Sequence, residues 1–253
     1  MVSSVLFVTV LAFQTPTAQT ANGLRPPPRT TPADPSKSLT PEMRGDVYAA
    51  RKMYRDAIDA YEEGPKNSAV VANKIGIAYH QLLELNMASR WYQRAIKLNP
   101  KYAEAINNLG TVYYAHKSYR RAITQYRRAL RLTPDAASIL SNLGTAYFAR
   151  KNYKDAFAMY QKALEIDPDV FERHSSYGVL LQERSVDERA KFHYYLAKTY
   201  AKAGKTDLAL QYIRKSLEEG FKDRQKYLTD PEFAGLQDNV EFKQMMATEQ
   251  KVL

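Results

Sequence analysis

The clearest pattern in the chain lies in residues 103–136, which read AEAINNLGTVYYAHKSYRRAITQYRRALRLTPDA. The segments that start at Ala69 and Ala137 align with this stretch without a gap, so the sequence repeats with a period of 34 residues. A fixed period of this length indicates stacked units, each of which buries its apolar face only against the next unit. The matched positions are Gly76, Gly110 and Gly144; Tyr79, Tyr113 and Tyr147; Ala88, Ala122 and Ala156; Tyr92, Tyr126 and Tyr160; Ala95, Ala129 and Ala163; and Pro100, Pro134 and Pro168.

This pattern resembles the tetratricopeptide-repeat (TPR) signature, a helix-turn-helix unit in which small and large packing positions alternate before a terminal proline. The resemblance implies an all-α superhelical solenoid of antiparallel helix pairs, with about five repeats and a C-terminal cap. We expect the glycines and alanines where the two helices of a unit cross, because their small size lets the backbones approach while tyrosines fill the neighbouring gaps. The proline should end the second helix, because it lacks the amide donor.

The alignment also predicts the domain organisation. Residues 38–68 form a degenerate first repeat with a shortened second helix, and Gly204 and Lys205 mark the turn of the last repeat. The predicted segments are the degenerate repeat 38–68, the full repeats 69–102, 103–136 and 137–170, an insertion over 171–189 that holds a short helix and a loop, a fifth repeat over 190–223, and a capping segment over 224–253.

The register of the insertion is ambiguous. Ala190, Tyr194 and Ala197 could belong to the second helix of a repeat that starts at Phe171, or to the first helix of the final repeat. The second interpretation is favoured, because residues 195–213 match a complete helix pair better.

The N-terminal residues predict export. Residues 1–21 hold an apolar run that is shorter than the ~20 residues of a membrane-spanning helix, followed by small residues at possible cleavage sites. This indicates a secretory signal and a periplasmic or secreted protein, although no Lys or Arg precedes the run; the alternative is an apolar tail on a cytoplasmic protein. Residues 22–37 are rich in proline and predict a disordered, extended linker.

Charge and residue types narrow the possible partners. The chain has 37 Lys plus Arg against 27 Asp plus Glu, a formal charge of +10 that favours anionic partners. It has no cysteine, which excludes a disulfide framework, a thiolate zinc site and a cysteine nucleophile.

Lys117 and five arginines concentrate positive charge in the third unit, and most should lie on the convex face. The predicted basic convex face comprises Arg120, Arg121, Arg127, Arg128 and Arg131.

Three interpretations of this basic face are open. It could steer an acidic protein, it could rest on an anionic membrane surface, or it could simply be a solvated helix face. Nucleic acid is not an expected partner, because no recognition motif accompanies the charge. The oligomeric state does not follow from the sequence.

The TPR resemblance implies that the first helix of each unit lines a concave groove. The motifs Asn108-Leu109-Gly110 and Asn142-Leu143-Gly144 are similar to the asparagine ladder by which some TPR proteins grip a peptide backbone. The alternative is that these asparagines only join adjacent repeats by hydrogen bonds. The groove lacks the basic residues of a carboxylate clamp, which argues against acidic C-terminal peptides. By this resemblance the groove residues are Asn73, Lys74, Ile77, His80, Asn107, Asn108, Thr111, Tyr114, Ser141, Asn142, Thr145 and Phe148.

These observations predict a non-enzymatic adaptor or scaffold that binds a peptide or a partner helix in the groove. One alternative is a structural subunit of a cell-envelope complex, assembled through the solenoid edges and the insertion over 171–189. An enzyme with an unrecognised site is the third possibility. The sequence has no phosphate loop, nucleophile elbow or dinucleotide fingerprint, and we expect no metal or cofactor. The histidines without metal-ligand spacing are His80, His116, His174 and His193.

Overall fold

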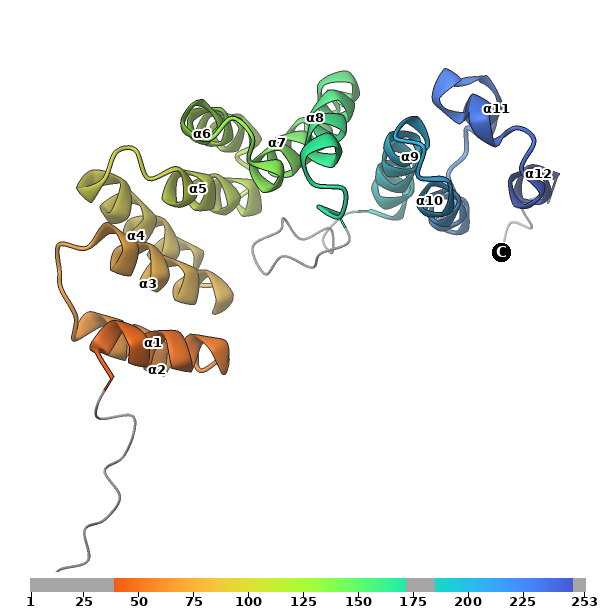
Figure 1. The fold of residues 1–253 in the computed structure, drawn as a ribbon. Helices are drawn as coiled ribbons and strands as arrows, with labels where there is room; N and C mark the ends of the chain where they lie inside the picture. Colours follow the sequence, from red (N-terminus) through yellow and green to blue (C-terminus); the bar gives the residue numbers. More distant parts are fainter. Residues whose placement is uncertain (1–38, 172–184, 248–253) are drawn as a thin grey trace, which may run out of the picture. The chain divides into compact units, whose positions relative to one another are not determined.

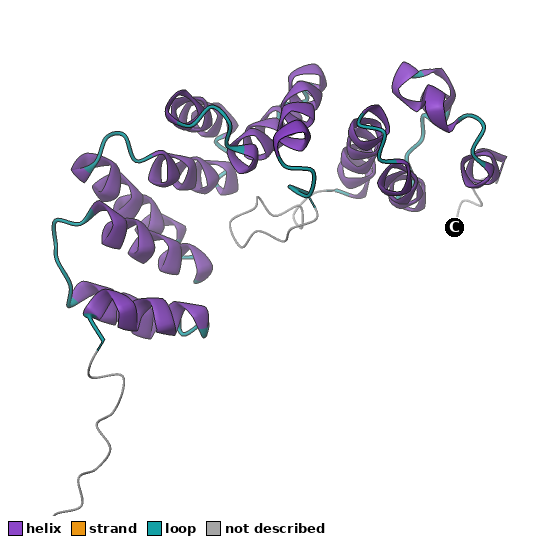
Figure 2. Ribbon diagram, viewed as in Figure 1, coloured by secondary structure: helices purple, strands orange, loops and turns teal. Residues whose placement is uncertain are grey.

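The computed structural model describes residues 39–171 and 185–247. Helices and connecting loops make up this described part, and it contains no strand (Figure 2). The predicted signal over 1–21, the linker over 22–37, most of the insertion and His174 lie outside the described residues. The export and linker predictions therefore stay predictions.

The described helices form consecutive antiparallel pairs, which confirms the predicted all-α solenoid (Figure 1). Three pairs, α3–α4, α5–α6 and α7–α8, share the same bounds shifted by 34 residues. The pairs are α1 (Pro41–Ala50) with α2 (Tyr54–Glu62), α3 (Ala69–Gln81) with α4 (Leu85–Leu98), α5 (Ala103–Ala115) with α6 (Tyr119–Leu132), α7 (Ala137–Ala149) with α8 (Tyr153–Ile166), and α9 (Val186–Lys202) with α10 (Thr206–Glu218). The chain continues with α11 (Gln225–Thr229), the 3₁₀ helix η2 (Pro231–Leu236) and α12 (Val240–Ala247).

In each full repeat, a glycine of the first helix packs against a tyrosine ring of the second helix. A Cβ atom added to Gly76, Gly110 or Gly144 would lie 2.6 Å from the ring of the tyrosine that follows 16 residues later, so the ring occupies the space that the glycine leaves open. These three tyrosines, Tyr92, Tyr126 and Tyr160, are fully buried. In the α9–α10 pair, alanine replaces the glycine at Ala197 and the smaller Ile213 replaces the tyrosine.

The turn inside each pair uses a left-handed backbone residue at the same position. The φ angles at these residues lie between +56° and +71°, the region that glycine adopts most easily. Only the last of these turns places a glycine there. The residues are Lys52, Leu83, Lys117, Lys151 and Gly204.

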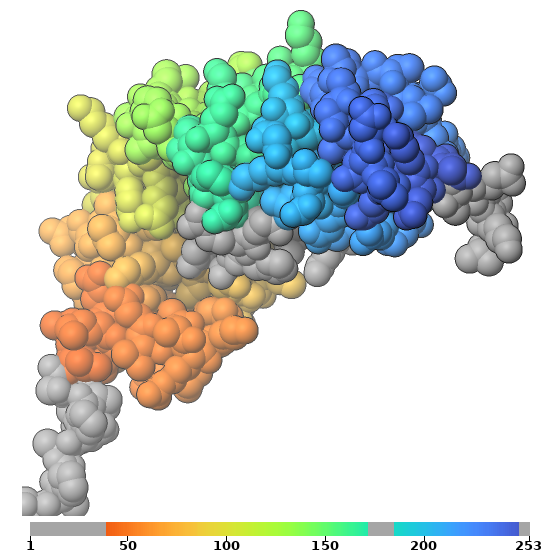
Figure 3. Space-filling model, turned by 45° about the vertical axis from the view of Figure 1, so that its right-hand side comes forward, coloured from red at the N-terminus to blue at the C-terminus, as the bar shows by residue number. Residues whose placement is uncertain are grey.

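Neighbouring pairs stack by packing each second helix on the next first helix, as α4 does on α5 and α6 on α7. Successive first helices also touch, since α3 contacts α5 and α5 contacts α7. The pairs therefore follow one another in chain order, as the colour sequence of Figure 3 shows.

The helix α9 begins at Val186, upstream of the predicted repeat start at residue 190. Ser185 explains the earlier start, because its hydroxyl accepts a hydrogen bond from the Glu188 amide at 3.3 Å. Asp187 and Glu188 then place negative charge in the first turn, where the helix dipole favours it. α9 packs against α10, so it is the first helix of the last pair.

The C-terminal segment caps this last pair. Tyr194 of α9 stacks on Phe221 with a centroid distance of 4.5 Å, and η2 packs against the same helix. Asp230 accepts hydrogen bonds from the Tyr194 hydroxyl and from Lys198, the latter at 2.8 Å. The fully buried side chains of this cap are Tyr227, Phe233 and Phe242.

Candidate functional site

All twelve predicted groove residues lie on the first helices α3, α5 and α7, and we call the surface that they form the first-helix face. Eight of the twelve are buried, which is more than a fully open binding surface would show. The half-exposed members are Lys74, Ile77, His80 and Ser141. The buried members are Asn73, Asn107, Asn108, Thr111, Tyr114, Asn142, Thr145 and Phe148.

Four asparagines on this face form one continuous hydrogen-bonded ladder. Asn142 donates to the Asn107 side-chain oxygen at 3.1 Å, and Asn107 donates to Asn108 at 3.3 Å. Asn108 donates to Asn73 at 3.1 Å, and Asn73 donates to the Glu104 carboxylate at 2.9 Å. Every amide thus points the same way across three repeats. This is the hydrogen bonding between repeats that the sequence left open as an alternative to peptide binding.

The ladder leaves one acceptor unused. Among the described residues, nothing donates to the side-chain oxygen of Asn142, whereas the oxygens of Asn73, Asn107 and Asn108 each accept a bond. An asparagine amide also has two N–H donors, of which Asn107 and Asn142 each use one within the described chain. These two side chains are 8% and 6% exposed, so each presents only an edge at the surface.

Two threonines beside the ladder satisfy their hydroxyls within their own helices. Thr111 donates to the Asn108 carbonyl at 2.7 Å, and Thr145 donates to the Ser141 carbonyl at 2.9 Å. Thr145 also accepts a bond from the Tyr160 hydroxyl at 3.3 Å. Their hydroxyls therefore contribute little capacity for a ligand.

The pKa values of Lys74 and His80 on the first-helix face are shifted by their surroundings. Burial disfavours the charge of Lys74, but hydrogen bonds to Asp46 at 2.8 Å and Glu42 at 2.7 Å outweigh it and raise the pKa of Lys74. Burial lowers the pKa of His80, which favours the neutral imidazole. The face therefore offers no unpaired positive charge, because two carboxylates oppose the charge of Lys74 and His80 favours its neutral form.

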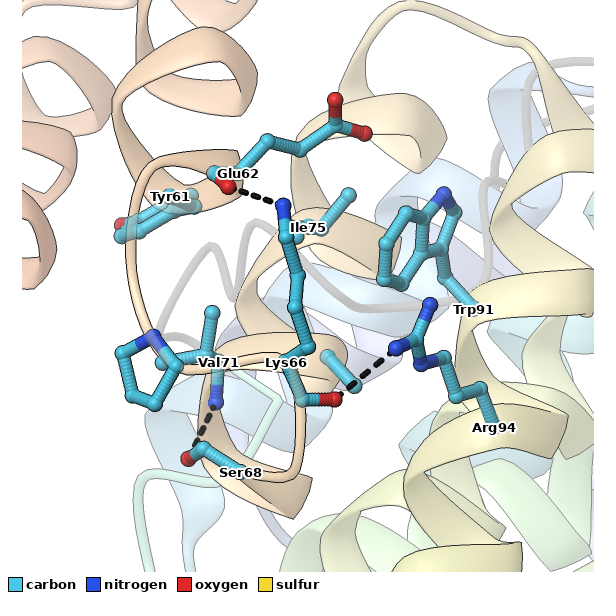
Figure 4. A pocket seen from close by; sticks show the side chains of 10 residues that line it. Tyr61, Glu62, Lys66, Ser68, Val71, Ile75, Trp91 and Arg94 are labelled. Carbon is cyan, nitrogen blue, oxygen red and sulfur yellow. Dashed lines mark hydrogen bonds between the residues drawn. The ribbon is translucent and has the colours of Figure 1, made fainter.

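A small cavity lies where α2 joins α3, and Figure 4 shows its lining. Its volume is about 10 Å³, the room that a single water molecule needs. The connection between α2 and α3 forms one side of it: Lys66 donates to the Glu62 carbonyl, and Arg94 donates to the Lys66 carbonyl at 2.8 Å. Trp91 forms another wall. This cavity is too small for an organic ligand.

The described histidines do not come together. His193 lies in the last pair with its Nδ1 atom 2.7 Å from Glu219, and burial lowers its pKa despite that carboxylate. In the described ranges, no group of three or more His, Asp and Glu side chains is placed to hold a metal ion. No helix described here combines the length and the apolar composition that a membrane span needs.

The predicted basic face lies on the solvent side of α6. Arg120, Arg121, Arg127 and Arg131 are exposed, whereas Arg128 is half-buried and donates to the Pro100 carbonyl at 3.1 Å. The opposite side of α6 is buried in the repeat.

Comparison with known proteins identifies the repeats. A family model described as "Tetratricopeptide repeat" matches residues 107–170, and a second, described as "TPR repeat", matches residues 76–117. Together, the two TPR models match residues 76–170. The matched TPR region includes the whole asparagine ladder beyond Asn73 and all of α6. A comparison with curated protein sequences finds no match.

Solved TPR structures resemble the chain. MamA from Desulfovibrio magneticus RS-1 is 20% identical, with a TM-score of 0.51, over 74% of this chain and 95% of that one. Another MamA structure is 23% identical, with a TM-score of 0.49, over 69% of this chain and 93% of that one. YrrB, described as a TPR protein with an unusual peptide-binding site, is 26% identical, with a TM-score of 0.46, over 57% of this chain and 74% of that one. The likeness to the Desulfovibrio magneticus structure, with its TM-score of 0.51, shows the fold alone.

Proposed function

We propose that this chain is a non-enzymatic TPR adaptor that binds a peptide or partner helix of another protein along the first-helix face. Solenoids of this kind present extended surfaces on which protein partners bind. The observation that carries the proposal is the asparagine ladder with its unused acceptor at Asn142. Ser141, the residue that precedes Asn142, is half-exposed.

An extended peptide suits the unused end of the ladder. Each peptide group offers one donor and one acceptor, and the Asn142 amide offers the complementary pair without reading the peptide sequence. The ladder adds to this match, because amides bonded in series polarise one another and strengthen the next bond. The buried asparagines would thus both join the repeats and position one binding edge.

The neutral character of this face predicts a partner segment of low charge. Lys74 is neutralised by Glu42 and Asp46, so it does not offer a free cation to an acidic peptide. We therefore expect binding here to depend on amide pairing and on contact with apolar side chains such as Ile77 rather than on ion pairs.

The test uses peptides that are selected from a displayed random library by their binding to the full chain. Ser141→Arg should weaken their binding at least about tenfold, or about 1.4 kcal/mol, because a long charged side chain would cover the Asn142 edge. The matched control is Gln93→Arg, which introduces the same side chain at an exposed position of α4. Fluorescence anisotropy of labelled peptides measures both affinities.

The control should change affinity less than about twofold, within the usual effect of a single surface charge. Equal losses in both variants, or a library that yields no binding peptide, would contradict the proposal. Substituting the asparagines themselves is a poorer test, because it also breaks the bonds between repeats.

A further inference from the structure

The positive charge of the chain is concentrated in one region. Residues 90–162 contain 14 Lys and Arg but only three Asp and Glu, a formal charge of +11, whereas the whole chain carries +10. The remaining residues are therefore close to neutral. This region covers parts of three repeats, and α6 is at its centre.

The arginines of α6 are not neutralised by the chain. Within residues 39–171 and 185–247, the structure shows no ion pair for any of the five arginines of α6. By contrast, Lys74 and Lys198 each contact two carboxylates. The α6 sequence itself contains no Asp or Glu.

Two of these arginines are held in place by tyrosines of the flanking first helices. The Arg121 guanidinium lies 4.1 Å from the centre of the Tyr113 ring and donates to its hydroxyl at 3.0 Å. The Arg127 guanidinium lies 5.6 Å from the centre of the Tyr147 ring and donates to that hydroxyl. A guanidinium that is fixed in this way loses less rotational freedom when it binds a partner.

We propose that the solvent face of α6 is a second binding site, separate from the first-helix face, and that it takes an acidic protein segment rich in Asp and Glu. We call this surface the α6 arginine face; it comprises Arg120, Arg121, Arg127, Arg128 and Arg131. Guanidinium groups form paired hydrogen bonds with carboxylates, and Arg120 and Arg131 have all their donors available within the described chain. The eleven-residue step between these two spans about 16 Å, so the partner should present carboxylates over that length.

Two other anionic partners fit the observations less well. The rings of Tyr113 and Tyr147 are already covered by guanidinium groups, so they cannot serve as stacking platforms for nucleic-acid bases. An anionic membrane attracts flexible basic segments by charge alone and does not require arginines held at fixed positions.

The probe is a labelled helical peptide of about 16 residues with glutamates along one side, and the same peptide with glutamines is the control ligand. The glutamate peptide should bind the full chain, and Arg120→Gln/Arg127→Gln/Arg131→Gln should weaken it at least about tenfold. The matched variant Lys97→Gln/Lys151→Gln/Lys154→Gln removes three exposed positive charges elsewhere in the basic region and should change affinity less than about threefold.

Two further variants separate charge from geometry and folding. Arg120→Lys/Arg127→Lys/Arg131→Lys keeps the charge but removes paired hydrogen bonding, so it should weaken binding by about threefold or more. Arg120→Gln/Arg131→Gln changes only exposed side chains and keeps the contacts of Arg121 with Tyr113 and of Arg127 with Tyr147, so a loss of binding in this variant would not come from losing those contacts.

Several outcomes would overturn this inference. One is that the glutamate peptide fails to bind, and another is that the glutamine peptide binds equally well. A third is that the arginine-to-glutamine and lysine-to-glutamine variants lose affinity equally, and a fourth is that the arginine-to-lysine variant keeps full affinity. Tighter α6-dependent binding to vesicles with about 30% anionic lipid, or to a single-stranded oligonucleotide of about 20 nucleotides, would assign the face to a membrane or to nucleic acid instead. None of these results depends on peptide binding at the first-helix face.

Discussion

Gly110 and Tyr126 set how closely α5 and α6 approach each other. Gly110→Ala places a Cβ atom 2.6 Å from the tyrosine ring, so we expect a loss of about 1–3 kcal/mol in the free energy of unfolding. Urea denaturation measures this loss. Gly235→Ala is the control, because a Cβ there meets nothing within 4 Å.

The pairing of Ala197 with Ile213 in the last repeat suggests a second test of this contact. In a Tyr126→Ile background, Gly110→Ala should cost clearly less than it does in the unmodified chain, because the smaller side chain makes room for the methyl group. Equal costs in the two backgrounds would show that the ring does not limit the approach.

Asn108 lies in the middle of the ladder and bonds to two neighbours. Asn108→Ala leaves the Asn73 oxygen and one Asn107 donor without these partners, so we expect a loss of about 1–3 kcal/mol. Urea denaturation of Asn108→Ala, Asn73→Ala and the double variant measures the effect. Additive losses would mean that the bond between Asn108 and Asn73 contributes nothing to stability.

For single residues, the sequence predicts the position on a helix better than it predicts the hydrogen-bond partner. The 34-residue period places Gly110 and Asn108 on their helices because both recur with it. It does not show that Asn107, one position before the repeated asparagine, accepts the bond from Asn142, since that depends on how far one repeat is rotated on the next.

The left-handed turn residues determine how each helix reverses into its partner. Leu83 adopts a φ of 60° although it is not a glycine, and its side chain is 72% exposed. Leu83→Gly should therefore stabilise the chain by about 1 kcal/mol, because it removes backbone strain and loses little apolar burial. Gly204→Ala should destabilise it by a similar amount, since the space there is open and only the backbone conformation opposes the change. Thermal unfolding measures whether Leu83→Gly raises stability and whether Gly204→Ala lowers it.

The contact between α9 and the cap depends on an ionised Asp230. Burial disfavours its charge, but bonds from Lys198 and Tyr194 outweigh it and lower the pKa of Asp230 below its ordinary value of 3.8. The stabilisation is therefore present above that value and is lost as the pH falls through the lower pKa of the folded state. Asp230→Asn should lose about 1–3 kcal/mol at pH 7, and the difference from the unmodified chain should shrink in acid. A constant difference from pH 7 to about pH 2 would contradict this account.

The element bounds were predictable where the period holds and not where it breaks. α3 to α8 follow the 34-residue spacing because every unit packs on an equivalent neighbour. The early start of α9 depends on the Ser185 cap, which lies in the insertion and matches no position of the other repeats.

On the whole molecule, the first-helix face, for which we propose peptide binding, is distinct from the α6 arginine face. Raising the salt from about 0.05 M to about 0.5 M shortens the distance over which exposed charges act. We expect binding of the acidic peptide to the α6 arginine face to weaken at least about tenfold over this range, whereas binding of selected peptides to the first-helix face should change less than about twofold. Titrations at both salt concentrations provide the comparison, and equal salt dependence of the two ligands would contradict the separation of the faces.

The fold and the basic face were predictable from repeat spacing and charge, but the state of the first-helix face was not. Burial of Asn73 and Asn108 depends on contacts between repeats, which a single unit does not reveal.

The most direct test of the claim that peptides bind the first-helix face is photo-crosslinking of a selected peptide, with a photoreactive residue at its centre, to the full chain. Mass spectrometry should locate the crosslinks on α3, α5 and α7, near Ile77 and Ser141. Crosslinks confined to α4, α6 and α8 would contradict the claim.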